Sequence, residues 1–467
     1  MPTASEQVLA DLCSRSFLSL WSYPSPYQDK GLAKQGEGKE LCDLLVIFGN
    51  DVIIFSDKSC AYPDTGGSEL DWKRWWKRAV AQSVVQISGA ERWLRQHAQR
   101  VFADKRCTKA LDVAIPPPAD LRIHRVIVAL NARVRCQQFF GSGSGSLMVE
   151  GSAHAGDAPQ APFRIAGAPV GTPFVHVLDD VGLHVLMNER DTVGDFVEYL
   201  TKKEEVMTRC HILATGEEDL LAYFLATLDV NGEHAFIPAG EQPPDMIFID
   251  ETHYRQLVEL PQYRHAKELN RQSYLWDGLI DHFTNVWRQG QILGGATGVE
   301  LERVLRTMAL PSRPERRALG QMVHLLMTHA GAAVRILESN GELAYASVSM
   351  QQPHGAPDDE YRQARQAAMV AYARSLKIRI PDIREALVLG FHAPHVGHTS
   401  EDLVLIGFED WNEEIERQTR EDMERFGWTA EGQRFTEVEF PLPVSREQAR
   451  RLRQIERLRK KKASTGP

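Results

Sequence analysis

The 467-residue sequence lacks the signatures of several protein classes. It has no run of eighteen apolar residues, which argues against a membrane-spanning helix. Its start has no basic stretch followed by an apolar block, so we predict no secretory signal. The six cysteines are scattered and form no Cys-x-x-Cys pair, which argues against a zinc ribbon or a disulfide framework. We therefore expect a soluble, cytoplasmic protein with reduced thiols and no membrane partner.

Charge is unevenly distributed along the chain, whose formal net charge is −9. Residues 71–106 contain nine Lys or Arg against three Asp or Glu, and residues 446–462 contain nine against two. The remainder therefore sums to −9 − 6 − 7 = −22. Two basic patches on an acidic body predict a directed contact with a polyanion rather than a general coating of nucleic acid. The alternative is a solvated helix face at each patch.

The order of predicted elements indicates an α/β fold with several domains. Residues 1–210 read as helix, two strands, helix, strand, loop, strands and helix, and the Gly- and Ser-rich stretch at about 141–165 predicts a flexible loop. We expect a mostly helical region over 211–325 and a small α/β domain over 326–440. A basic helical tail is expected over 441–467.

One predicted hairpin carries polar residues that a purely structural hairpin does not need. The stretch ELCDLLVIFGNDVIIFSDKS, residues 40–59, predicts two apolar strands joined at Gly-Asn-Asp. Burying an unpaired acid or amine is costly. With a two-residue loop, Asp43 lies opposite Ser56 or Lys58, and all three share one face within roughly 5 Å. A three-residue loop would bring Asp57 to that face instead.

Asp43 lies on the first strand, and Ser56 and Lys58 follow it on the second strand by thirteen and fifteen residues. This arrangement resembles the restriction-endonuclease-like PD-(D/E)XK nuclease superfamily, whose motif has an acid followed by an acid-x-lysine. The resemblance covers about residues 5–130, or up to 205, and implies a restriction-endonuclease-like domain over 1–210 with a mixed sheet flanked by helices. It implies Mg²⁺ (or Mn²⁺) held by Asp43, with Glu6 on the preceding helix in support. Lys58 would orient or deprotonate the attacking water, and such chemistry needs a hard cation on oxygen ligands.

The helix after the hairpin supplies further candidates under this resemblance, which implies a Lys or Gln pointing toward the site. Gln82, Gln86 and Lys77 are the residues of that kind. The basic cluster Lys73, Arg74, Lys77 and Arg78 would bind phosphates. Trp72, Trp75 and Trp76 lie within this cluster and would either stack on bases or form a core stripe.

Ser56 departs from the family pattern, because it stands where the family has Asp or Glu. A hydroxyl is a poor substitute for a carboxylate on Mg²⁺. Asp57, Glu40 or Glu37 would then supply the missing charge, or the site is catalytically degenerate. A third interpretation is an unrelated hairpin in which Lys58 protects a strand edge.

From these observations we expect a metal-dependent nuclease that acts on nucleic acid, with DNA as the expected substrate. The alternative is a degenerate nuclease-fold protein that binds nucleic acid or serves as a scaffold. The C-terminal half would provide contacts to a protein partner. By analogy with the family, such a nuclease would belong to a bacterial defence or mobile-element system.

Overall fold

The first element is a capped helix that leads into a mixed sheet. α1 (Ala4–Phe17) begins after Thr3, whose hydroxyl accepts a hydrogen bond from the Glu6 amide at 3.2 Å. The Glu6 carboxylate accepts the Thr3 amide in return at 2.7 Å. This capping box satisfies two amides at the start of the helix. The computed structural model describes residues 3–151, 161–166, 173–290, 298–328, 330–337, 340–393 and 400–428.

The main N-terminal sheet has five strands in the order β1-β4-β5-β7-β10. Its first three strands form an antiparallel meander, and the last two run parallel to β5. Phe48 pairs with Asp51, so the β4–β5 hairpin has the two-residue loop Gly49-Asn50, one of the loops considered from the sequence. The bounds are β1 (Ser22–Pro24), β4 (Leu44–Phe48), β5 (Asp51–Ser59), β7 (Arg122–Leu130) and β10 (His176–Leu178).

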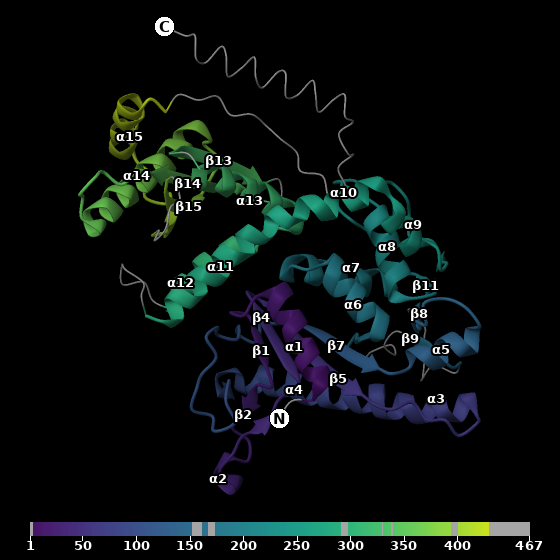
Figure 1. Cartoon of the computed structure of the whole chain (residues 1–467). Coiled ribbons are helices and arrows are strands. Elements are labelled where there is room, and N and C mark those ends of the chain that lie inside the picture. Colours follow the sequence, from purple (N-terminus) through teal and green to yellow (C-terminus); the bar gives the residue numbers. More distant parts are fainter. Residues whose placement is uncertain are drawn as a thin grey trace.

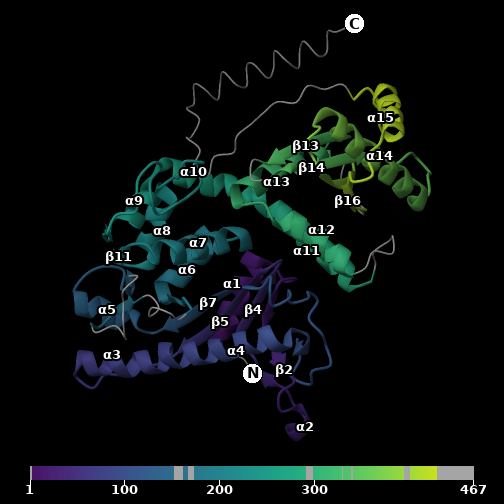
Figure 2. The same cartoon turned by 180° about the vertical axis from the view of Figure 1, so that it is seen from behind.

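Helices cover both faces of this sheet (Figures 1 and 2). On one face Phe55 of β5 packs on Phe196 of α7 with ring centroids 6.2 Å apart, and Phe196 also packs on α1. On the other face Ser56 contacts α4. α4 (Gln82–His97) continues α3 (Ser68–Trp76) through a π-helical turn at Lys77–Ala81. α7 spans Val193–Met207 and follows α6 (Asp180–Glu189).

A second sheet corrects the predicted loop over 141–165. β8 (Met148–Gly151) and β9 (Arg164–Ala166) pair in parallel, and residues 152–160 lie outside the described part. β8 also pairs with β11 (His211–Ala214), which pairs with β12 (Met246–Ile249), so the predicted boundary at 210 divides a continuous sheet. The sequence did not indicate β8, because its apolar pattern is only four residues long and directly follows Gly and Ser residues. Its partner β11 lies sixty residues away in the sequence.

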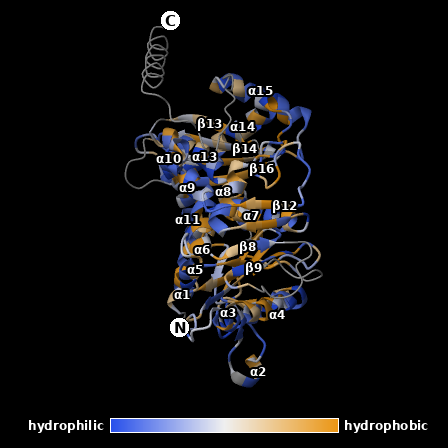
Figure 3. Cartoon of the chain, turned by 90° about the vertical axis from the view of Figure 1, so that its right-hand side faces the viewer, coloured by the Kyte–Doolittle hydropathy of each residue, from blue (hydrophilic) through white to orange (hydrophobic). Residues whose placement is uncertain are grey.

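The remaining elements form a helical middle and a C-terminal sheet (Figure 1). The sheet has the order β13-β14-β15-β16 and packs against α14, which in turn packs against α15. It joins the middle region where the Tyr345 hydroxyl donates to the Thr307 carbonyl at 2.9 Å. Figure 3 shows the sheets as mainly hydrophobic bands between more hydrophilic helices. The middle helices are α8 (Glu217–Ala226), α9 (His253–Glu259), α10 (Pro261–Leu269), α11 (Ser273–Arg288), α12 (Gly298–Ala309) and α13 (Arg313–Thr328).

The C-terminal elements are β13 (Gly331–Leu337), β14 (Asn340–Met350), α14 (Asp358–Arg379), β15 (Glu385–His392), β16 (Asp402–Gly407) and α15 (Glu413–Phe426). Smaller elements are β2 (Tyr27–Gln28), α2 (Leu32–Gln35), β3 (Lys39–Glu40), β6 (Val101–Phe102) and α5 (Arg133–Phe140). The predicted basic tail over 441–467 lies outside the described residues. Within the described part, no helix combines the length and apolar character needed to cross a bilayer.

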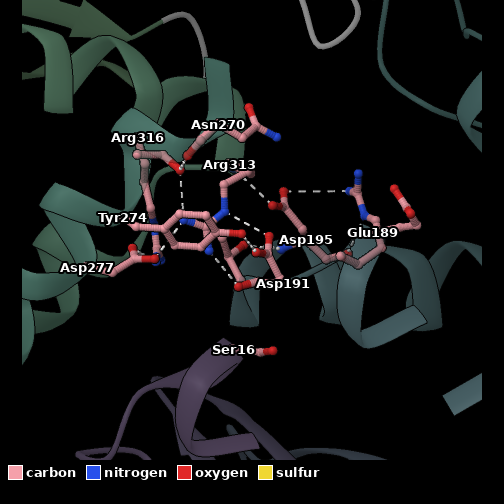
Figure 4. Close-up of polar contacts among 12 residues, drawn as sticks. Ser16, Glu189, Asp191, Asp195, Asn270, Tyr274, Asp277, Arg313 and Arg316 are labelled. Atoms are coloured by element: carbon pink, nitrogen blue, oxygen red, sulfur yellow. Dashed lines mark hydrogen bonds and ion pairs between the residues drawn. The ribbon is translucent and has the colours of Figure 1, made fainter. Parts of the chain in front are cut away.

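A buried ionic network joins the helical middle to the N-terminal region (Figure 4). Arg313 at the start of α13 binds Asp191 at 2.7 Å and Asp277 of α11 at 2.6 Å, and Arg316 binds the second oxygen of Asp277 at 2.7 Å. The other guanidinium nitrogens of these two arginines donate to carbonyls or to Ser273. Burial lowers the pKa of Arg313, but the two carboxylates more than offset this and raise it. The network is therefore fully paired.

Removing Arg313 should be strongly destabilising, because Asp191 and Asp277 would remain buried without their partner. We expect Arg313→Ala to lower the free energy of unfolding by roughly 3–5 kcal/mol, measured by urea denaturation. The matched control is Arg303→Ala, which removes an exposed pair with Glu385 and should cost about 1 kcal/mol or less. Equal losses for the two variants would contradict the account of the network.

Candidate functional site at the carboxyl end of strand β5

Asp43 and Lys58 lie together at the end of the hairpin. The ladder between β4 and β5 ends at the pair Leu44 and Phe55, and Asp43 directly precedes β4. Its Oδ2 atom lies 3.6 Å from Lys58 Nζ and accepts the Asp57 amide at 2.6 Å. The Asp43 side chain is 6% exposed and that of Lys58 28%. A buried carboxylate is thus paired with an amine that solvent can still reach.

Three more acids surround this pair. Burial raises the pKa of Asp57, the Ser5 hydroxyl lowers it, and the negative charges of Asp43 and Glu6 raise it further against the opposing effect of Lys58. Burial likewise raises the pKa of Glu40, and Asp43 and Glu6 add to that rise. Among the described residues, Lys58 is the cation that acts on both Asp57 and Glu40, against the negative charges of Asp43 and Glu6, which leaves the cluster short of positive charge.

One oxygen of this cluster has no hydrogen-bond partner. Asp57 is 4% exposed, and its Oδ1 atom is buried and unpaired among the described residues. An unsatisfied buried carboxylate oxygen is costly and commonly marks the place of an ion or an ordered water. Oxygen atoms of this kind are the ligands that Mg²⁺ prefers. The donor chemistry therefore fits a hard cation beside Asp57.

Two predicted catalytic residues lie outside this cluster. Ser56 is fully buried beneath α4, and its hydroxyl pairs with Gln86 at 3.4 Å rather than with Asp43. Gln82 is exposed, and Gln86, one helical turn later, makes the contact with β5. The interpretation of Ser56 and Gln82 as groups at the reacting centre is therefore corrected. Both residues are better explained as part of the packing between the helix and the sheet.

Glu6, expected to support the metal, lies in the first turn of α1. One of its carboxylate oxygens is held by the Thr3 amide in the capping box. Its charge still acts on Asp57 and Glu40. Glu6 therefore adds negative potential to the cluster from the end of α1.

The predicted phosphate-binding cluster is exposed beside the segment that follows Lys58. Lys73, Arg74, Lys77 and Arg78 are all exposed on α3 and the π-helical turn. Arg78 donates to the Ala61 carbonyl at 2.9 Å and Arg74 to the Thr65 hydroxyl at 3.4 Å. These two contacts fix the loop after β5 against the basic helix.

The tryptophans of this segment belong to the core rather than to a stacking surface. Trp72 and Trp75 are 2% and 0% exposed, and Trp76 is partly buried. The Trp75 indole donates to the Leu130 carbonyl at 3.3 Å. Of the two alternatives left open by the sequence, the structure favours the core stripe.

The described residues contain no group of three or more His, Cys, Asp or Glu side chains arranged to hold a metal ion. The acids around Asp57 are near one another but are not assembled as a ready-made set of ligands. Comparison with known proteins found no matching family model, no matching curated protein and no matching solved structure. Functional inference therefore rests on the geometry of this chain.

The crowding of acids predicts a pH-dependent effect of Asp57→Asn. The pKa of Asp57 is raised in the folded state. Between the pKa of the unfolded chain and that of the folded protein, Asp57 therefore keeps its proton in the folded protein and has lost it in the unfolded chain. Wild-type stability should therefore fall as pH rises from about 4. The Asn variant lacks this loss and should be the more stable protein at pH 7.

Urea unfolding at several pH values measures the gap between the two proteins. We expect the gap to widen from pH 4 upward and then to level off. Asp120→Asn, a change at an exposed acid, is the control and should show no such widening. A gap that is constant or reversed would contradict the charge balance inferred for the cluster.

Proposed function

We propose that the N-terminal sheet carries a metal-dependent nuclease centre that cleaves phosphodiester bonds, with DNA as the expected substrate. The observation that carries this proposal is the cluster in which Asp43 meets Lys58 at 3.6 Å beside the unpaired oxygen of Asp57. Two further observations support it. The cluster lies on a mixed sheet flanked by helices, and an exposed basic helix follows it directly in the sequence.

Asp43 and Asp57 would hold the cation, Mg²⁺ or Mn²⁺. When bound, the cation would polarise a phosphate oxygen and lower the pKa of a bound water. Glu6 and Glu40 would raise the affinity for it through their negative charge. The Asp57 amide fixes the Asp43 carboxylate by its hydrogen bond at 2.6 Å, so this ligand is already oriented.

Lys58 has the exposure needed to contact substrate. Its amine is partly open to solvent while its counter-charge Asp43 is buried. In the proposed reaction it orients the attacking water and stabilises negative charge that develops on the scissile phosphate. Lys73 and Lys77 on the neighbouring helix would bind flanking phosphates and position the strand.

A second function is favoured by specific observations. Ser56 contributes no carboxylate and is bound to Gln86, and three convergent metal ligands are absent from the described residues. Both findings suit a nuclease-fold protein that binds nucleic acid without cutting it. In that case the charge of Lys58 and the basic helix would serve binding alone.

Cleavage assays separate the two functions. The full-length protein is incubated with plasmid, linear and single-stranded DNA in Mg²⁺ or Mn²⁺, and in EDTA. We expect metal-dependent cleavage that falls by roughly 10²–10⁴-fold in Lys58→Ala, because losing a group that orients water or stabilises charge has that effect. Lys109→Ala, at an exposed lysine outside the cluster, should cleave at the wild-type rate.

Asp43→Asn is the variant of choice at the metal-binding position, because asparagine keeps an oxygen that can accept the Asp57 amide. It should fold as wild type does and lose cleavage. Asp43→Ala leaves that buried amide unpaired and would confound folding with chemistry. Cleavage that is equal in wild type and Lys58→Ala, or that persists in EDTA, would overturn the proposed centre.

A further inference from the structure

A small aromatic pocket lies at the same edge of the sheet as the Asp43 cluster. Its volume is about 270 Å³, and Tyr62, Phe139 and Phe163 are among the residues that line it. Tyr62 lies in the loop after β5, and Phe139 lies on α5, which follows β7. Because β5 and β7 are parallel, both segments leave the carboxyl ends of their strands. Ligands of open α/β sheets bind at such edges.

The walls of this pocket are a cluster of aromatic rings. Tyr62 stacks on Phe163 with centroids 5.5 Å apart and planes 18° apart, and Phe139 packs on Phe163 at 5.2 Å. Phe163 is 2% exposed, whereas Phe139 is 47% exposed. Phe139 therefore presents ring surface to solvent while buried rings support it from behind. Exposed aromatic surface of this kind is suited to stacking on a planar ligand.

Polar groups stand at the mouth of the pocket and in its wall. Arg135 forms an ion pair with Asp64 and donates to the Gln138 side-chain oxygen at 3.1 Å. All three residues line the pocket. The Tyr62 hydroxyl is buried and has no hydrogen-bond partner among the described residues. The pocket thus combines an aromatic wall with donors and acceptors, as pockets for small planar ligands do.

We propose that this pocket receives one unpaired base of a single-stranded nucleic acid, an inference that rests on the proposed function of the Asp43 cluster. The volume of about 270 Å³ lies below the roughly 300–1,000 Å³ of pockets for drug-sized ligands. It therefore suits a single ring system and not a base pair. Stacking on aromatic side chains accepts any base, because every base has a π-face.

The position of the pocket supports a nucleotide as its occupant. Tyr62 follows Lys58 by four residues, so their Cα atoms are at most ~14 Å apart. A strand whose scissile phosphate contacts Lys58 can therefore place a base a few nucleotides away in the pocket. The pocket is also lined by Ser68 and Asp71 of α3, the helix whose exposed Lys73 and Arg74 would hold the intervening phosphates.

Fluorescence of 2-aminopurine tests this assignment without requiring cleavage. The probe is a single-stranded DNA oligonucleotide with one 2-aminopurine, added to the full-length protein in EDTA. We expect binding to quench the probe at one preferred position, because the base stacks on the aromatic wall. Phe139→Ala should abolish that quenching and weaken binding by roughly 5- to 150-fold. Phe426→Ala changes an equally exposed phenylalanine on α15 and should leave both unchanged.

An abasic oligonucleotide completes the test. Removing the base at the preferred position should weaken binding of the oligonucleotide to the wild-type protein. The Phe139→Ala variant should bind the abasic and the intact oligonucleotide with equal affinity. Equal binding of all oligonucleotides to both proteins would overturn the base pocket, whatever the cleavage assays show. If the pocket effects are found and cleavage is absent, the base pocket stands and the proposed nuclease activity fails. The two proposals therefore fail independently.

Discussion

The carboxylate of Asp43 determines how the end of the β4–β5 hairpin is built. By accepting the Asp57 amide at 2.6 Å, it takes the place of a backbone acceptor at the point where the ladder ends. This bond fixes Asp57, whose side chain then lies in the field of Glu6 from α1. The same oxygen lies 3.6 Å from the Lys58 amine. One buried carboxylate thus sets the relative positions of Asp57 and Lys58.

Two ionic clusters of this protein differ in how completely they are paired. Around Arg313 and Arg316, the guanidinium nitrogens and the facing carboxylates of Asp191 and Asp277 are all matched, which suits a role in holding helices together. Around Asp43, Lys58 is the cation that acts on both Asp57 and Glu40 among the described residues, and a buried Asp57 oxygen is unpaired there. Charge imbalance that packing alone does not require is typical of functional sites. This contrast is the physical basis for proposing a functional site at the end of β5.

The sequence predicted the local chemistry of the hairpin better than its surroundings. The observed loop Gly49-Asn50 is one of the alternatives that the sequence left open, and the acid-to-lysine spacing indicated that Asp43 and Lys58 would meet. The partner of Ser56 was not predictable, because the π-helical turn at Lys77–Ala81 changes which residues of the following helix face the sheet. Gln86, one of the three candidates on that helix, makes the contact with Ser56, and Gln82 is exposed.

Long-range pairing explains the other differences from the sequence-based prediction. β8 is a four-residue strand next to a Gly- and Ser-rich stretch, and only its pairing with β11 makes it part of a sheet. Arg313 and Arg316 are residues of a type that is usually exposed, yet they are 4% and 1% exposed. The acids that neutralise them come from other segments, Asp277 from α11 and Asp191 from the turn between α6 and α7. Periodicity along one segment carries no information about such partners.

Binding of Mn²⁺ to the full-length protein, followed by electron paramagnetic resonance, tests the central claim most directly. The claim is that Asp43 and Asp57 form a cation-binding site. We expect wild type and Asp120→Asn to bind Mn²⁺ equally, and Asp43→Asn and Asp57→Asn each to lose this binding while remaining folded. Binding that is the same in wild type and Asp57→Asn, or no binding by wild type at millimolar Mn²⁺, would contradict the account.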